Sequence, residues 1–197
     1  MVLFEGKSLG KRFGRSWIFK NLDLTIQPGD RIAVLGSNGS GKSTLLKIIA
    51  GFERPSKGEV AQLDPKPEFG FSAPWSDLYE DLSLVQLFEL HTSFRSFPMQ
   101  LDPFLDKCWL KEHKLKAFSS LSSGMKQRFK LGLALWGNEP LVLLDEPTSN
   151  LDMDGKEWYK EQLGSSPKDK AVLVATNEPI FDTDSSFRRL AIADYKQ

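Results

Sequence analysis

The chain has 197 residues, 40% of them hydrophobic, and its 26 Lys and Arg residues balance its 26 Asp and Glu residues. This length supports one hydrophobic core and is short for two, so we expect a single domain over residues 1–197. The balanced charge excludes an overall field that would attract nucleic acid, so we expect no nucleic acid partner and only local phosphate sites.

Two further features bear on the compartment. Cys108 is the single cysteine, which excludes an internal disulfide, and we interpret it as part of an apolar helix face. Charge and glycine interrupt MVLFEGKSLGKRFG too early for a signal peptide, and no run approaches the roughly 18 apolar residues of a membrane helix. We expect a cytoplasmic chain that does not itself span a membrane.

The first predicted elements are two strands and a helix. Residues 17–26 close with alternating apolar and polar residues, which predicts a half-exposed strand. RIAVLG, residues 31–36, is a continuous apolar run typical of a strand buried on both faces. A glycine-rich loop leads from it to KSTLLKIIAG, residues 42–51, which has one apolar helix face and closes at Gly51.

The middle of the chain predicts mostly helices. EFGFSA, residues 68–73, is interpreted as a strand, and Ser83 as the cap of an amphipathic helix after it. LDPFLDKCWL, residues 101–110, predicts another helix, with Asp102 as its cap and Pro103 at its first position.

Two apolar strands follow, LVLLD at residues 141–145 and AVLVAT at residues 171–176, with the helix-like DGKEWYKEQLG between them. Strands that alternate with helices in this order predict an α/β fold with a parallel sheet. A mostly helical insert is expected from about residue 74 to residue 137.

GSNGSGKST matches the P-loop pattern and lies between a predicted strand and a predicted helix, as that motif requires. Its members are Gly36, Ser37, Asn38, Gly39, Ser40, Gly41, Lys42, Ser43 and Thr44. The glycines let backbone N–H groups point inward and the helix N-terminus adds positive charge, so phosphate is the natural ligand. Lys42 would reach the outer phosphates, and the Ser43 hydroxyl would bind Mg²⁺. A flexible Gly-Ser loop before a helix is the plainer alternative.

LVLLDEP delivers Asp145 and Glu146 to the end of a buried strand, where open α/β sheets bind their ligands. Asp145 suits Mg²⁺, directly or through water, and Glu146 suits a general base that polarises the attacking water. Two solvated acids at a strand end are the alternative.

LSSGMKQR, residues 121–128, places Ser122, Ser123 and Gly124 at a predicted helix start, where hydroxyl and N–H groups make a second anion site or an ordinary helix cap. This stretch is similar to LSGGQ, the signature motif of the nucleotide-binding domain of ATP-binding cassette (ABC) transporters. SNLD, which ends at Asp152, resembles that family's D-loop, and the resemblance covers essentially the whole chain.

The resemblance implies a P-loop NTPase fold with a mostly parallel central sheet, an N-terminal antiparallel β-subdomain and an inserted α-helical subdomain. It implies an ATPase with ATP and Mg²⁺ as cofactors, and a homodimer or pseudo-dimer in which the signature of one cassette holds the γ-phosphate of its neighbour's ATP. A separate transmembrane permease subunit would hold the chain on the cytoplasmic face of a membrane. Phe13 occupies the place of the aromatic residue that stacks on adenine.

The sequence departs from the family at three positions. Pro74 aligns with a glutamine that contacts Mg²⁺ and water, and proline offers neither a side-chain amide nor an N–H, so Ser72, Ser76 or a water would have to replace it. Asn177 replaces the switch histidine and cannot carry its positive charge. Met125 replaces the last residue of the signature, a change that leaves its serines and glycine in place. We expect a slower or differently regulated ATPase, with Asn177 at the γ-phosphate.

Two surfaces are candidates for partners. Seven basic residues between Lys107 and Lys130 are expected to form a solvated helix face, with anionic headgroups or acidic side chains of a partner as the alternative. Trp75, Leu78 and Tyr79 would line, by resemblance, a groove for a short helix of the membrane subunit, or would pack under the insert.

Other function classes remain open at this point. A soluble ABC-type ATPase acting on ribosomes or nucleic acid is disfavoured, because such proteins usually carry two cassettes and this chain carries one. A regulatory module that binds ATP and scarcely hydrolyses it is motivated by Pro74 and Asn177. A monomeric P-loop kinase or GTPase is disfavoured by the signature and LLDEPTSNLD.

Overall fold

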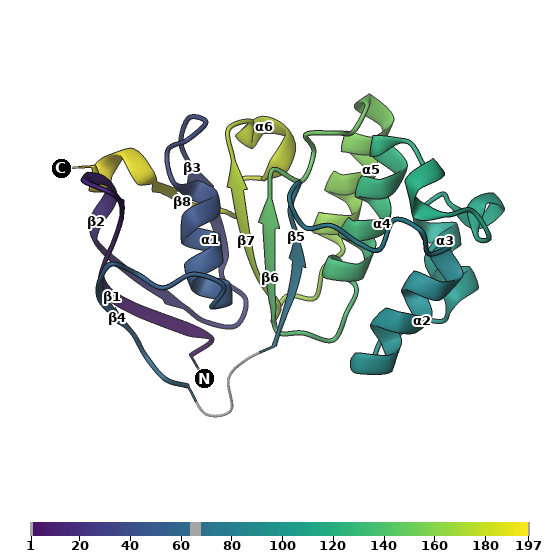
Figure 1. Cartoon of the computed structure of the whole chain (residues 1–197), viewed down its shortest axis with the longest axis horizontal. Helices are drawn as coiled ribbons and strands as arrows, with labels where there is room; N and C mark the ends of the chain where they lie inside the picture. The colour runs from purple at the N-terminus through teal and green to yellow at the C-terminus, as the bar shows by residue number, and fades with distance from the viewer. Residues whose placement is uncertain (1, 64–67, 197) are drawn as a thin grey trace.

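Five parallel strands form the central sheet of the computed structural model, which describes residues 2–63 and 68–196 (Figure 1). In spatial order they are β5 (Phe69–Ser72), β6 (Leu141–Asp145), β7 (Ala171–Thr176), β3 (Arg31–Leu35) and β8 (Arg188–Ala191). Every neighbouring pair in this sheet is parallel. The carboxyl ends of all these strands therefore meet at one edge.

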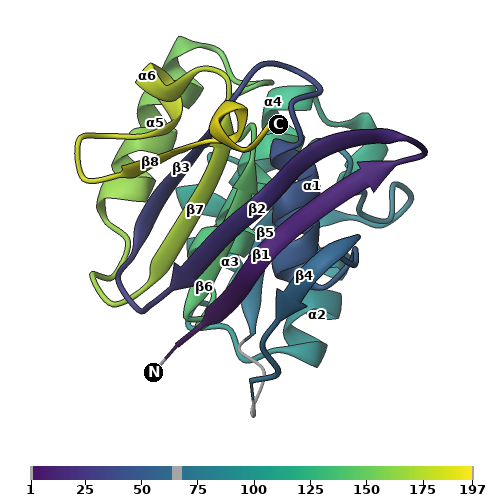
Figure 2. The same cartoon turned by 90° about the vertical axis from the view of Figure 1, so that its left-hand side faces the viewer.

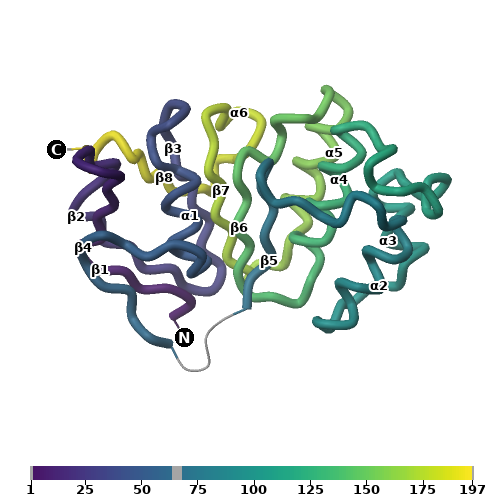
Figure 3. Tube along the Cα trace, in the orientation of Figure 1, coloured from purple at the N-terminus to yellow at the C-terminus, as the bar shows by residue number. Residues whose placement is uncertain are grey.

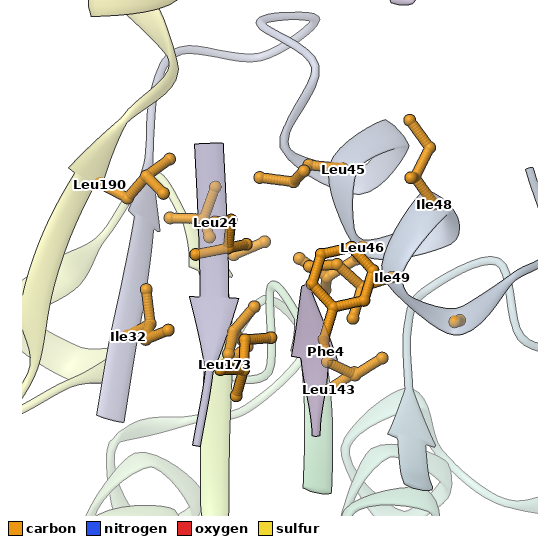
Figure 4. Close-up of a cluster of buried hydrophobic side chains, with 14 of the residues drawn as sticks. Phe4, Leu24, Ile32, Leu45, Leu46, Ile48, Ile49, Leu143, Leu173 and Leu190 are labelled. Atoms are coloured by element: carbon orange, nitrogen blue, oxygen red, sulfur yellow. The ribbon is translucent and has the colours of Figure 1, made fainter. Parts of the chain in front are cut away.

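The central strands are hydrophobic without interruption because both of their faces are covered. Successive side chains alternate between the faces, so that Leu143 and Leu173 pack toward the helix α1 (Lys42–Ala50), and Val142 and Val172 pack toward α5 (Met153–Gly164). Figure 4 shows the first of these clusters, which also receives side chains from the N-terminal strands. Burial of this kind contributes roughly 25 cal/mol per Å² of apolar surface.

An antiparallel sheet covers α1 on the side away from the central sheet, as Figure 2 shows. It consists of β1 (Phe4–Phe13), β2 (Ser16–Ile26) and β4 (Lys57–Val60), with β1 in the middle. Sequence reasoning predicted β2 and missed β1 and β4. The reason is that β1 carries glycines, charged residues and several register irregularities, which hide the alternation expected of a half-buried strand.

The helical part of the chain lies at the opposite end of the molecule from the antiparallel sheet (Figure 3). It contains α2 (Leu84–Phe94), α3 (Leu101–Lys107) and α4 (Ser123–Leu135), together with 3₁₀ turns at Lys111–His113 and Phe118–Ser120. These elements fall within the predicted insert. They share their own apolar cluster, and α4 also packs on the central sheet next to α5.

Two capping predictions for the insert have different outcomes. Ser83 caps α2 through a complete capping box, with its Oγ accepting from Gln86 N and the Gln86 side chain accepting from Ser83 N. The prediction for α3 is wrong: the helix begins two residues earlier, at Leu101, with Gln100 at the N-cap, and Asp102 and Pro103 lie in its first turn. A proline is tolerated anywhere in the first turn because those N–H groups have no partner within the helix.

Cys108 is fully buried at the end of α3, where it packs in the apolar cluster of the insert. Burial raises the pKa of its thiol, so the side chain behaves as a small apolar group, as predicted.

The short helix α6 (Pro179–Asp182) and a 3₁₀ turn at Ile192–Tyr195 complete the described elements. A mostly parallel central sheet, an N-terminal antiparallel sheet and an inserted group of helices confirm the predicted fold class. Among the described residues, no helix has both the length and the apolar character needed to cross a membrane.

Candidate functional site

Four loops meet at the carboxyl edge of the central sheet because β5, β6, β7 and β3 are adjacent and parallel. The 36–44 loop follows β3, and Pro74 and Trp75 follow β5. Asp145 ends β6 with Glu146 directly after it, and Asn177 follows β7. The topology therefore brings together residues that are distant in the sequence. Such an edge is where ligands bind in open α/β sheets.

A cavity of about 580 Å³ opens at this edge. It is lined by Phe13, Ile18, Asn38, Gly39, Ser40, Gly41, Lys42, Ser43, Thr44, Pro74, Trp75, Asp145 and Glu146. Most of the predicted P-loop, both predicted acids and Phe13 thus share one cavity. Its size is in the range typical of small-molecule and cofactor sites.

The 36–44 loop depends on glycine at two positions. Gly39 and Gly41 adopt φ angles of 73° and 110°, which side chains with a Cβ rarely tolerate. A Cβ on Gly41 would also collide with the side chain of Ile18. Gly41 is the N-cap residue of α1, so its conformation sets where the free N–H groups of the helix start are directed.

Lys42 is buried at the base of the loop. Its Nζ donates to the carbonyl oxygens of Gly36 at 2.9 Å and Ser37 at 3.2 Å, and lies 3.3 Å from a carboxylate oxygen of Glu146. An ammonium group beside backbone N–H donors is the arrangement that P-loops use to bind phosphate.

Asp145 is buried, and its Oδ2 accepts a hydrogen bond from the indole Nε1 of Trp75 at 3.1 Å. Its Oδ1 is also buried and has no hydrogen-bond partner within residues 2–63 and 68–196. The Ser43 hydroxyl belongs to the same cavity. A carboxylate oxygen without a partner and a hydroxyl that line the same cavity are of the ligand type that Mg²⁺ prefers.

Glu146 has a strained backbone, with a φ of 48° that is rare for residues other than glycine. The N–H of Glu146 donates to Ala175 O in β7 at 2.8 Å, which fixes the strand end. In this conformation the side chain lines the cavity and pairs with Lys42. A carboxylate in this place can accept a proton from a water.

Asn177 contacts the phosphate-binding loop and Phe13 lines the cavity, while the roles predicted for them at the γ-phosphate and at adenine stay predictions. The Asn177 amide Nδ2 donates to Asn38 Oδ1 at 3.0 Å, so the residue after β7 contacts the phosphate-binding loop directly. Phe13 is 54% exposed at the end of β1, with Lys11 Nζ 5.3 Å from its ring centre. An exposed ring at the rim of a cavity is suited to stacking, and its contact with adenine stays a prediction.

The signature residues lie outside this cavity, at the start of α4. Ser122 is the N-cap, and its Oγ accepts from Met125 N at 3.2 Å. Gly124 approaches Asn150, since a Cβ built on it would lie 3.1 Å from Asn150 O. Ser122 and Ser123 are exposed, so an anion has access to the free N–H groups of this helix start.

The predicted D-loop, Ser149–Asp152, lies between β6 and α5. Asp152 is the N-cap of α5, and its Oδ1 accepts from Gly155 N at 2.9 Å. The structure thus assigns the Asp152 side chain a capping role, while the loop before it lies against the signature. The loop is further fixed by Gln127, whose Nε2 donates to Pro147 O at 2.8 Å.

Neither serine that was predicted as a substitute for the missing glutamine is directed at a ligand by its contacts, and a water in that role stays a prediction. The Ser76 hydroxyl is engaged in a turn with the backbone of Ala73, and Ser72 is fully buried with no partner for its Oγ among the described residues. Trp75 contacts Asp145 instead. Trp75 was predicted to line a groove for a partner, but its indole lies in the cavity at the sheet edge.

The basic stretch of the insert is mostly occupied by local contacts. Lys126 pairs with Glu80 at 2.8 Å, Lys130 donates to Ala73 O at 2.9 Å, and Arg128 donates to Cys108 O at 3.0 Å. These three side chains are half-buried with partners in the chain, which differs from the solvated helix face that was expected.

Comparisons with known proteins agree with this geometry. The family model of ABC transporters matches residues 19–149. An uncharacterised ABC transporter ATP-binding protein of Haemophilus influenzae is 33% identical over 187 residues, which cover 91% of this chain and 76% of that protein. The cytochrome c biogenesis ATP-binding export protein CcmA of Pseudomonas aeruginosa is 30% identical, with 89% and 92% covered. The dimeric ATP-binding cassette MJ0796, solved in a post-hydrolysis state with ADP and Pi, is similar with a TM-score of 0.77 at 26% identity, over 92% of this chain and 90% of that one.

Proposed function

Because this chain belongs to the ABC transporter family and is one of its ATPase domains, we propose that it powers a separately encoded membrane-spanning subunit by binding and hydrolysing ATP. The observation that carries this proposal is the convergence of Lys42, Asp145 and Glu146 on one cavity beside the phosphate-binding loop. These are the groups that ATP hydrolysis requires: a phosphate ligand, a metal ligand and a base.

Within the cavity each group has a distinct task. The N–H groups of residues 36–44 and the Lys42 ammonium group would bind the phosphates, and Ser43 and Asp145 would hold Mg²⁺. Mg²⁺ supplies charge neutralisation on the phosphate oxygens. Glu146 orients a water and accepts its proton. Since Lys42 lies between Gly36 O and Glu146, phosphate binding would draw Lys42 away from Glu146 and release the base.

The arrangement of the chain favours a head-to-tail pair. The signature lies apart from the cavity of its own chain, and its exposed helix start would bind an anion that the cavity of the same chain does not bring to it. In a symmetric pair, each signature would cover the cavity of the partner, which gives two composite ATP sites. The similar cassette MJ0796 is dimeric. Closure of such a pair needs only a higher affinity of ATP for the closed form.

A groove of about 360 Å³ between the central sheet and the insert is the proposed contact with the membrane subunit. Its lining includes Phe52, Phe69, Phe71, Leu78, His91, Phe94, Arg95 and Lys130. Phe94 is 81% exposed, and a short helix with apolar side chains would bury it. This position would place the chain on the cytoplasmic face of a membrane.

A weakly hydrolysing regulatory module is the second candidate function, and Pro74 and Asn177 favour it. Pro74 lines the cavity without an N–H or an amide. Asn177 offers a neutral amide in place of a charged ring. The first change removes a polar side chain and the second removes a positive charge near the expected γ-phosphate, so we expect slow turnover in the transporter role as well.

Purification from the native cell tests the proposed role. We would tag the chain, solubilise membranes gently and identify what co-purifies by mass spectrometry. A stoichiometric multi-span protein that is lost in Phe94→Glu and retained in the matched control Leu115→Glu is the expected result, since Leu115 is similarly exposed at 79% and lies outside the groove. Ribosomal proteins, or no partner, would contradict the proposal.

A further inference from the structure

Trp75 makes a contact that the family resemblance does not predict. Its indole Nε1 donates to Asp145 Oδ2 at 3.1 Å, and the carboxylate is 1% exposed. The other oxygen, Oδ1, has no hydrogen-bond partner among the residues that the structure describes. Only one oxygen of this buried carboxylate has a hydrogen-bond partner. A buried charge is stable only when it is paired or coordinated, so Oδ1 is suited to bind a further ligand.

The indole is 38% exposed and has two neighbours that restrict its position. The Phe71 ring centre lies 5.1 Å from that of Trp75, and Lys47 Nζ lies 4.2 Å from the indole centre. The turn that carries Trp75 is closed by the hydrogen bonds between Ser76 Oγ and the backbone of Ala73. These contacts and the closed turn restrict the indole, so its N–H can orient the carboxylate of Asp145.

We propose that Trp75 is a positioning residue for ATP hydrolysis, which holds Asp145 so that Oδ1 is the oxygen presented to Mg²⁺. The inference rests on the proposed function. Trp75 follows directly on Pro74, the residue that replaces the expected glutamine, and it lines the same cavity. The indole N–H thus supplies a hydrogen-bond donor at a place where proline supplies none.

The expected change in Mg²⁺ affinity can be estimated from hydrogen-bond donors that orient metal ligands in other proteins. A donor that orients a metal ligand typically changes metal affinity by about 10- to 100-fold when it is removed. Trp75 is not expected to touch the phosphates, because the phosphate donors are on the 36–44 loop. Its loss should therefore act on the Mg²⁺ dependence of the site and leave the affinity for metal-free ATP unchanged.

The variant Trp75→Phe tests this directly, since phenylalanine keeps an aromatic ring beside Phe71 and Lys47 and removes the donor. The affinity for a fluorescent ATP analogue is measured in EDTA and across a Mg²⁺ titration. We expect the Mg²⁺ concentration for half-maximal binding to rise about tenfold, with affinity in EDTA unchanged. High Mg²⁺ should restore kcat, which a general loss of structure would not allow. Trp109→Phe is the matched control, because Trp109 is exposed and outside the cavity.

A measurement on the unaltered chain covers the case in which Trp75→Phe folds poorly. The sequence contains five tryptophans, so ¹⁵N-tryptophan labelling gives at most five indole N–H resonances. With ATP bound in EDTA, addition of Mg²⁺ should shift one indole resonance more than the others. Single Trp→Phe changes at the other four tryptophans assign their resonances, and the remaining resonance belongs to Trp75.

The outcomes separate this inference from the proposed function. A wild-type chain that binds no ATP would contradict the proposed function itself. A wild-type chain whose ATP affinity rises with Mg²⁺, and a Trp75→Phe variant with the same Mg²⁺ titration, would overturn the positioning role alone. A Trp75 indole resonance that does not shift when Mg²⁺ is added would also overturn the positioning role.

Discussion

The Lys42 ammonium group lies 3.3 Å from the Glu146 carboxylate, and both side chains line the cavity that the 36–44 loop borders. The proposed phosphate ligand and the proposed base therefore neutralise each other. Phosphate oxygens compete with Glu146 for the same ammonium group, so binding of the nucleotide and release of the base are linked by one residue.

Lys42→Ala should weaken ATP binding. The change removes a charged contact worth about 2–3 kcal/mol, which corresponds to a rise of about 30- to 150-fold in Kd. Isothermal titration with ATP and Mg²⁺ measures the effect. Lys116→Ala is the control, because Lys116 is an exposed lysine distant in the sequence from the loop. Unchanged affinity in Lys42→Ala would exclude Lys42 as a phosphate ligand.

Asn177→His should raise ATP turnover. A histidine can donate a charge-assisted hydrogen bond to the γ-phosphate, whereas the present amide is neutral and donates to Asn38 at 3.0 Å. A gain of about 1 kcal/mol in the transition state would increase kcat about fivefold. Steady-state phosphate release measures it. A fall in kcat would show that the contact with Asn38 matters more than the charge.

Ser123→Glu should prevent pairing of cassettes around ATP. Its carboxylate would stand at the helix start that is proposed to meet the γ-phosphate of the partner, and the two negative charges repel. Light scattering of the Glu146→Gln chain with ATP and Mg²⁺ should give twice the monomer mass, and addition of Ser123→Glu should return it to the monomer. Ser119→Glu serves as control, because this exposed serine lies in the preceding 3₁₀ turn. A dimer that persists with Ser123→Glu would refute the composite site.

His91 should make the fold less stable in mild acid. Burial lowers the pKa of its imidazole, the nearby charge of Arg95 also lowers it, and Glu139 raises it in part. The folded state then binds fewer protons than the unfolded state below pH about 6.5, so the free energy of unfolding falls as pH drops through that region. Urea denaturation of wild type and His91→Leu at pH 7.5 and pH 5.5 measures this. The loss in free energy of unfolding caused by His91→Leu should be smaller at pH 5.5 than at pH 7.5. An equal loss at both pH values would contradict a lowered pKa of His91.

The sequence was sufficient for the elements that carry the site. β3, β6 and β7 are continuous apolar runs, and the observed bounds of β6 and β7 match the prediction. This succeeds because strands covered on both faces need hydrophobic side chains at every position. The loops that follow them carry motifs whose residue types are dictated by phosphate and metal chemistry, so their members could be named without coordinates.

The parts that were missed depend on tertiary contacts. β1 is half exposed and irregular, and no local periodicity in its sequence predicts its pairing with β2 and β4. Trp75 and Asp145 are 70 residues apart in the chain. They come into contact only because β5 and β6 are neighbouring strands. An indole after a proline gives no signal for such a role, and only the register of the two strands reveals it.

The most direct test of the account compares ATP turnover by the wild-type chain and by Glu146→Gln, with ATP binding measured on both. Glutamine keeps the shape of the side chain but cannot accept the proton of the attacking water, and it no longer pairs with Lys42. The account predicts a turnover at least about 100-fold lower with ATP bound as tightly or more tightly. Equal turnover in the two chains would contradict the account and would favour the regulatory module that binds ATP and scarcely hydrolyses it.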